Sequence, residues 1–217
     1  MAASIAVLIV EDQSLLLDAL RTSLSGVDGV TVVGYAGSAE QARSLDVHYD
    51  VLLTDISLPG ENGVQLARAC KERRPELGIL LLSAHAFPSV LGQLDEFPDG
   101  WGYLLKDSVT DVEELVRAVR LVADGGVMID GALRRSARRG GGTVLDGLSP
   151  GQWQLLQAIS GGWSNQAIAD QLKLTPKSVE NAVGRLYQQL GVDATDRTRN
   201  ARVEATRLLL RHALDVR

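Results

Sequence analysis

Residues 52–60 constrain the fold of this 217-residue chain more than any other segment. They form a short apolar run that ends on a carboxylate, Asp55, and is followed by the turn Pro59-Gly60. A short apolar run bounded by turn residues is typical of a strand buried on both faces of a parallel sheet. Open sheets of this kind carry their functional groups at the carboxyl ends of the strands. The sequence therefore predicts an α/β fold with Asp55 at the functional edge of its sheet.

A second apolar run, at residues 5–10, ends on the acidic pair Glu11-Asp12. The carboxyl ends of parallel strands share one edge of a sheet, so we expect these carboxylates to lie beside Asp55. Like charges that close together are unfavourable unless a hard cation binds them, and Mg²⁺ prefers oxygen ligands. The sequence therefore predicts a Mg²⁺ site at this edge.

Short apolar runs alternate with amphipathic segments through the first half of the chain. Strands are expected near residues 5–10, 30–36, 51–54, 79–83 and 102–105, and helices near 14–25, 38–46, 62–73, 88–96 and 111–124. This alternation predicts an α/β doubly wound, five-stranded parallel sheet. The fourth and fifth strands end on Ser83 and Lys106, which places a hydroxyl and an ammonium group at the same edge.

An acidic pair, a central Asp, a hydroxyl and a Lys in this order resemble the receiver domain of bacterial two-component response regulators, over residues 4–123. The resemblance implies a flavodoxin-like fold and phosphorylation of Asp55 by a partner histidine kinase. It implies that Lys106 pairs with the phosphoryl oxygens and that Ser83 binds the new phosphoryl group. It also implies a set of Mg²⁺ ligands, namely the carboxylates of Glu11, Asp12 and Asp55 and the main-chain carbonyl of Ser57.

Two further receiver functions follow from the same resemblance. Ser83 and Tyr103 match the family's switch pair, in which the hydroxyl binds the phosphoryl group and the aromatic ring moves into the space that it leaves. Ser57 and His85 match positions that modulate dephosphorylation. Simpler interpretations remain open: Tyr103 as a core aromatic with its hydroxyl at the surface, and His85 as a solvated loop residue.

From residue 148 onwards the pattern is purely helical. Helices are expected to begin at Ser149-Pro150 and Thr175-Pro176, because a hydroxyl cap followed by Pro at the first helical position favours a helix start. Ser164 is expected to cap a short helix between them. Gly191 ends the third helix, and a last helix is expected at 198–214. A short helix, a tight turn and a second helix form the helix-turn-helix arrangement.

Residues 148–192 resemble the LuxR-type DNA-binding domain, and a receiver followed by that domain is the architecture of the NarL/FixJ subfamily. The resemblance implies a phosphorylation-controlled transcriptional regulator that forms a homodimer on activation and binds double-stranded DNA. Candidate DNA contacts lie on the helix that begins after Thr175, and they are Thr175, Lys177, Ser178, Glu180, Asn181 and Arg185. Glu180 departs from the family, which usually has a Lys there, so a protein-binding output domain remains an alternative.

Charge divides the chain in the same way as the motifs. We expect a receiver at residues 1–124, a linker at 125–147 and a DNA-binding domain at 148–217. Residues 1–133 carry 9 basic and 20 acidic side chains, and residues 134–217 carry 13 basic and 7 acidic ones. The net charges are therefore −11 and +6, which fits an acidic regulatory half joined to a half that meets a polyanion.

Other classes of protein fit the sequence less well. The longest N-terminal apolar run is too short for a signal peptide or a membrane span, so we expect a cytoplasmic protein. A single cysteine, Cys70, excludes an internal disulfide. We do not expect an enzyme, since haloacid-dehalogenase-like phosphatases need a second acid where this chain has Ser57. An atypical regulator with a phosphorylation-independent receiver is the main alternative.

Overall fold

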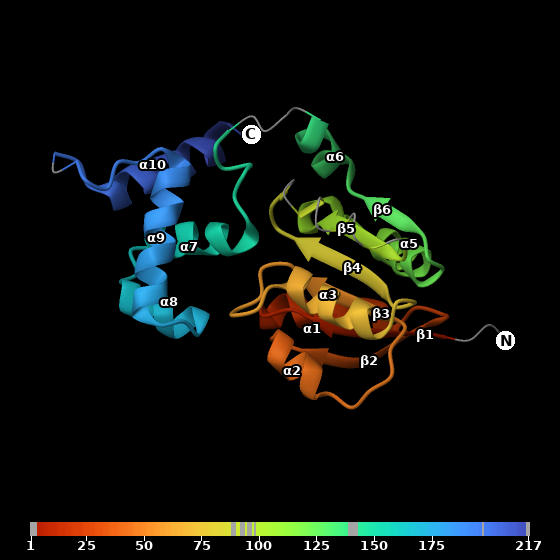
Figure 1. Cartoon of the computed structure of the whole chain (residues 1–217). Helices are drawn as coiled ribbons and strands as arrows, with labels where there is room; N and C mark the ends of the chain where they lie inside the picture. The colour runs from red at the N-terminus through yellow and green to blue at the C-terminus, as the bar shows by residue number, and fades with distance from the viewer. Residues whose placement is uncertain are drawn as a thin grey trace.

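The computed structural model describes residues 4–87, 90–91, 94, 97, 99–138, 143–196 and 198–215. Figure 1 shows two parts, a twisted sheet flanked by helices and a separate group of helices. The sheet is parallel throughout, with the strand order β2-β1-β3-β4-β5-β6. Its strands are β1 (Ile5–Val10), β2 (Val30–Ala36), β3 (Val51–Asp55), β4 (Gly78–Ser83), β5 (Trp101–Leu105) and β6 (Val127–Ile129).

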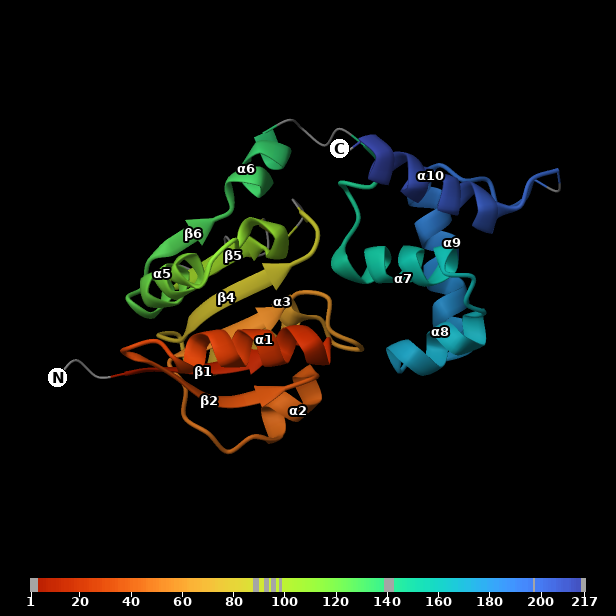
Figure 2. The ribbon, with the colours of Figure 1, turned by 180° about the vertical axis from the view of Figure 1, so that it is seen from behind.

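Helices cover both faces of the sheet, as Figures 1 and 2 show from opposite sides. On one face lie α1 (Ser14–Ser25) and α5 (Val112–Ala123), and on the other lie α2 (Ala39–Ser44) and α3 (Gly63–Arg73). Successive side chains of a strand point to opposite faces, so Val7 and Ile9 of β1 pack with α1 and α5. Leu8 and Val10 pack on the other side. Burial on both faces explains why the strands are continuous apolar runs.

The prediction of five strands is wrong, because β6 adds a sixth. It pairs with β5, with Val127 opposite Trp101 and Ile129 opposite Tyr103, within the segment that the sequence assigned to the linker. A three-residue edge strand with Val127 46% exposed leaves too short a pattern to be recognised in the sequence. Helix α6 (Gly131–Arg138) follows directly. Most of the predicted helix at 88–96 lies outside the described residues, as do residues 139–142 of the linker.

The second part consists of α7 (Pro150–Ser160), α8 (Asn165–Leu172), α9 (Pro176–Leu190) and α10 (Ala201–Asp215). The predicted caps are confirmed, since the side chains of Ser149, Ser164 and Thr175 each accept a hydrogen bond from a backbone N–H of the first turn. Helix α8 ends at Lys173, whose left-handed backbone (φ 54°) makes the tight turn into α9. Within the described parts of the chain, every helix is too short or too polar to cross a lipid bilayer.

Gly63 gives a test of how closely α3 packs on the functional edge. A Cβ atom at Gly63 would lie 1.9 Å from the carbonyl oxygen of Asp55. We therefore expect Gly63→Ala to push α3 away from β3 and to lower the free energy of unfolding of the sheet domain by about 2 kcal/mol or more in urea denaturation. Gly184→Ala is the control, since a Cβ there meets nothing within 4 Å and should raise the stability of α9 by about 1 kcal/mol. Unchanged stability in Gly63→Ala would contradict the prediction.

Candidate functional site

Three carboxylates meet at the carboxyl edge of the sheet. Glu11 and Asp12 follow β1, and Asp55 is the last residue of the neighbouring strand β3. One oxygen from each of the three lies within 4.8 Å of the others. Glu11 and Asp55 are buried, with 1% and 3% of their surface exposed, whereas Asp12 is exposed. The structure thus brings together the three carboxylates that the sequence predicted.

Lys106 places one positive charge among these carboxylates. Its Nζ lies 2.8 Å from Oε2 of Glu11 and 2.9 Å from Oδ2 of Asp55. Burial alone would lower the pKa of Lys106, but hydrogen bonds to these two carboxylates raise it, so the ammonium stays charged. Three carboxylates and one ammonium still leave an excess of negative charge at this edge.

Burial, and after it the neighbouring charges, shift the pKa values of two of these acids. Burial raises the pKa of Glu11 to about 7, and the charge of Asp55 adds to this while Lys106 opposes it. Burial and Asp55 likewise raise the pKa of Asp12. A carboxyl with a raised pKa in the folded state adds stability below its ordinary value near 4.5, and loses it as the pH rises through about 7. A divalent cation would offset the unfavourable energy of keeping these carboxylates ionised, and a set of hard oxygen donors suits Mg²⁺.

The predicted switch residues meet at one carbonyl group. The hydroxyl of Ser83 donates to the main-chain oxygen of His85 at 2.7 Å, and the hydroxyl of Tyr103 donates to the same oxygen at 2.9 Å. Tyr103 also accepts from the N–H of Phe87 at 3.1 Å. Its side chain, including the hydroxyl, is buried, and burial raises the pKa of Tyr103 to about 12. Both residues therefore fix the loop that follows β4, and the alternative interpretation of Tyr103, with its hydroxyl at the surface, does not hold.

The two residues predicted to modulate dephosphorylation lie in different loops, Ser57 after β3 and His85 after β4. The backbone N–H of Ser57 donates to Oδ1 of Asp55 at 3.0 Å. His85 lies in the loop after β4 and is half-buried, because a side chain of the helical domain covers it. The structure does not place His85 as a freely solvated residue.

Trp153 of α7 is the residue that covers His85. The two ring centroids are 4.6 Å apart, and Trp153 also lies edge-on to Phe87 at 6.2 Å. Only 6% of the Trp153 surface is exposed. Figure 1 shows α7 directed at the carboxyl edge of the sheet. Trp153 thus packs on the same loop that Ser83 and Tyr103 hold.

Polar contacts surround this aromatic contact. The side-chain amide of Gln154 donates to the carbonyl of Leu58 at 3.2 Å, and that of Gln157 lies 3.4 Å from Nε2 of His85. A cavity of about 350 Å³ remains between the two domains. It is lined on the receiver side by Asp12, Asp55 and Ser57, and on the helical side by Gln154, Gln157, Trp163 and Ile168. The acidic cluster thus opens into a cavity that can admit a small molecule.

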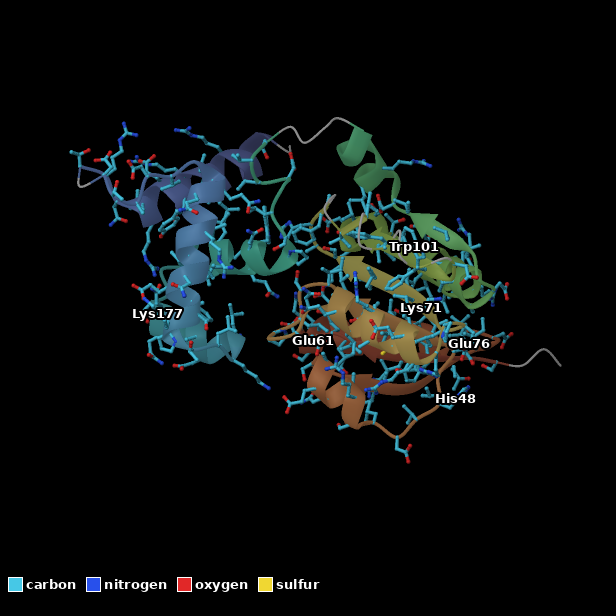
Figure 3. All side chains as sticks on the ribbon, viewed as in Figure 1. His48, Glu61, Lys71, Glu76, Trp101 and Lys177 are labelled. Carbon is cyan, nitrogen blue, oxygen red and sulfur yellow. The ribbon has the colours of Figure 1, made fainter. Side chains whose placement is uncertain are left out.

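The candidate DNA-binding residues all lie on exposed positions of α9 or at its cap: Thr175, Lys177, Ser178, Glu180, Asn181 and Arg185. Lys177 is marked in Figure 3, near the end of α9 that follows α8. Its Nζ lies 2.8 Å from Oε2 of Glu180, and this contact lowers the pKa of Glu180. Glu180 therefore offsets the charge of the first basic side chain on the helix.

One ion pair and one shared cavity join the helix-turn-helix unit to the receiver. Lys173, in the turn, lies 2.5 Å from Oε2 of Glu40 in α2. Arg185 and Ala182 of α9 line a second cavity together with Gly60 of the loop between β3 and α3, the loop that also carries the labelled Glu61 in Figure 3. Part of the α9 surface therefore faces the receiver.

Sequence reasoning missed the residues that join the domains. Trp153 is a large aromatic residue near the start of α7, which indicates a core position or a partner surface, but the sequence does not indicate which residue it contacts. Gln154, Gln157 and Phe87 carry no recognisable motif, and a contact between distant segments has no period in the sequence.

Comparisons with known proteins identify the same two domains in the same order. Residues 7–120 match the family described as response regulator receiver domain, and residues 146–203 match the bacterial regulatory proteins of the luxR family. The chain is 34% identical to the DNA-binding transcriptional activator DevR/DosR of Mycobacterium tuberculosis, over 93% of this chain and 94% of that protein. It is also 34% identical to a probable transcriptional regulatory protein NarL of the same species, over 86% and 88%.

Among solved structures, RcsB from Salmonella enterica serovar Typhimurium, bound to a promoter in the presence of a phosphomimetic, has a TM-score of 0.60 at 24% identity. The match covers 88% of this chain and 94% of that one, and it supports the fold. The chain belongs to the response regulators of the NarL/FixJ type, DNA-binding transcriptional regulators in which a receiver domain precedes a LuxR-type helix-turn-helix domain.

Proposed function

We propose that Asp55 is the phosphoryl acceptor and that a sensor histidine kinase is the donor. The observation that carries this is the Lys106 ammonium, which contacts Asp55 and Glu11 at once beside an open cavity. In the transfer, an oxygen of Asp55 forms a bond to phosphorus while the bond from phosphorus to the donor imidazole breaks. Phosphoryl transfer depends mainly on positioning and on charge neutralisation. Lys106 supplies one positive charge to the phosphoryl oxygens.

A Mg²⁺ ion would supply the remaining charge neutralisation. The carboxylates of Glu11, Asp12 and Asp55 and the carbonyl of Ser57 would hold it, which fits the raised pKa values of Glu11 and Asp12. Ser57 contacts Asp55, and His85 contacts Gln157, which lines the same cavity as Asp55. Both residues would influence the approach of water to an acyl phosphate. Trp153 and Gln157 cover His85, so the domain contact also limits that approach.

The phosphorylation site has a direct test. Incubation with acetyl phosphate and Mg²⁺ should add one phosphoryl group, visible by intact-mass analysis, and Asp55→Asn should abolish it because the nucleophilic carboxylate is lost. Asp107→Asn is the matched control, since Asp107 is an exposed carboxylate next to Lys106. Labelling that persists in Asp55→Asn, or that needs no divalent cation, would contradict the proposal.

We infer that phosphorylation weakens the contact between the domains. A phosphoryl group on Asp55 adds negative charge and strong acceptors, and the hydroxyl of Ser83 on the neighbouring strand can donate to it. Ser83 would then release the His85 carbonyl, leaving Tyr103 as its partner. The loop beneath Trp153 would shift, and a larger group in the cavity would separate the two domains. Release would separate Arg185 of α9 from the receiver loop at Gly60, which lines the same cavity.

The released regulator would act as a homodimer on double-stranded DNA. Val203 and Leu210 of α10 are seven residues apart and 45% and 57% exposed, an apolar stripe that a second copy can cover. The side chain of Leu214, which the sequence places on the same stripe, lies outside the described residues. A two-fold dimer would bind a pseudo-palindromic site.

Removal of the domain contact should mimic phosphorylation. We expect Trp153→Ala to bind a genomic DNA fragment selected for this regulator about tenfold more tightly than the wild type, in the absence of a phosphoryl donor. The substitution removes the aromatic contact between α7 and His85 and so weakens the attachment of the helical domain to the receiver. Fluorescence anisotropy measures the affinity, and light scattering should show a larger dimeric fraction. Beryllofluoride with Mg²⁺ should bring the wild type to the same state.

Trp163→Ala is the control for this experiment, because Trp163 lines the cavity but is 42% exposed. It should leave the affinity for DNA close to that of the wild type. If Trp153→Ala and Trp163→Ala behave alike, or if an activated monomer binds DNA at full affinity, the coupling that we propose is wrong.

Glu180 should reduce non-specific binding to DNA. Glu180→Lys removes a negative charge and frees Lys177, so we expect tighter binding to random DNA and a log-log salt slope steeper by about one unit. Glu204→Lys is the control, because Glu204 pairs with Arg207 at the same spacing on α10. Equal slopes for wild type and Glu180→Lys, measured by titration at several salt concentrations, would mean that Glu180 points away from the duplex.

A further inference from the structure

Asp130 is a buried carboxylate in the connector, between β6 and α6, with 6% of its surface exposed. Its backbone N–H donates to the carbonyl of Tyr103 at 2.8 Å. Its Oδ1 accepts from the N–H of Ala132 at 2.7 Å, and its Oδ2 accepts from the N–H of Leu105 at 3.2 Å. One residue thus joins the start of α6 to the end of β5.

This arrangement exceeds what a helix cap requires. A cap needs one oxygen, as at Asp111, which is exposed and accepts from the N–H of Glu114 at the start of α5. The second oxygen of Asp130 instead binds Leu105, the residue before Lys106. Burial alone would raise the pKa of Asp130, but hydrogen bonds, first of all from the side chain of Ser108, lower it. The charged carboxylate is therefore the form that these donors stabilise.

Two of the residues that Asp130 binds, Leu105 and Ser108, flank Lys106 along the chain. Lys106 begins a single 3₁₀ turn, Lys106–Ser108, so Leu105 precedes that turn and Ser108 ends it. The ammonium of Lys106 must reach Glu11 and Asp55 together, at 2.8 and 2.9 Å, from a side chain with four flexible carbons. The position of its backbone decides whether it can do so.

We propose that Asp130 is a positioning residue for phosphoryl transfer. It lies in the segment that leads to the DNA-binding domain, and it holds the turn that carries Lys106. The inference rests on the proposed role of Asp55, and it adds a residue that no receiver motif in the sequence indicates. A displacement of reacting groups by about 1 Å can slow a reaction by orders of magnitude. The hydrogen bonds from Leu105 and Ser108 to Asp130, which we call the Asp130 clamp, therefore affect the rate of phosphoryl transfer although Asp130 does not touch the phosphoryl group.

Asp130→Ser tests the clamp in the full-length chain. Serine remains a good helix cap for α6 but has one oxygen, so it cannot also bind Leu105. We expect the maximal rate of phosphorylation by saturating acetyl phosphate to fall about tenfold. The Mg²⁺ concentration for half-maximal rate should not change, because the carboxylates that would hold Mg²⁺ follow β1 or end β3 and are not part of the turn that Asp130 holds. Hydrogen exchange at the Leu105 amide should become faster.

Ser108→Ala, which removes a single hydrogen bond, should give a smaller fall in the maximal rate, and Asp111→Ser should behave as the wild type. A wild-type rate in Asp130→Ser, or an equal loss of rate and of apparent Mg²⁺ affinity, would overturn the role of Asp130 and leave that of Asp55 intact. A wild-type protein that takes up no phosphoryl group would overturn both.

Discussion

The charge balance at the end of β3 is the constraint on which the rest of the structure depends. Glu11 and Asp55 are buried side by side, and burying two carboxylates is unfavourable unless a cation compensates. Lys106 reaches them because the strand order places β3 between β1 and β4, with β5 next to β4. The turn after β5 must therefore be fixed in space, which links the sheet topology to the clamp at Asp130.

The same edge of the sheet holds the two domains together. Ser83 and Tyr103 share the His85 carbonyl, and Trp153 lies on the other side of that loop. Among the described residues, one aromatic side chain, two side-chain amides and the exposed ion pair of Lys173 with Glu40 carry the contact. A contact of that size can be broken by a change of a few kcal/mol, which is within the range of one new phosphoryl group and its hydrogen bonds.

The polar residues at the carboxyl edge of the sheet could be predicted from the sequence, whereas the sixth strand and the contact between the domains could not. Glu11, Asp55, Ser83 and Lys106 each end an apolar run, and parallel strands bring such ends to one edge. β6 could not be predicted, because three residues after two glycines show no periodicity. The contact of Trp153 with His85 depends on how two domains dock, which local patterns do not encode. The pairing of Lys177 with Glu180 follows from helical spacing once the helix is known.

The turn at Lys173 has a consequence for how α8 and α9 move. Among the described residues it is the one non-glycine with a positive φ, a conformation that costs an L-residue about 1 kcal/mol. Glycine would adopt it freely, but glycine would also leave the turn free to adopt other angles. Lysine thus makes the pair of helices a stiffer unit, at some cost in stability. Such a unit would meet the DNA groove as a preformed body, with little entropy left to lose on binding.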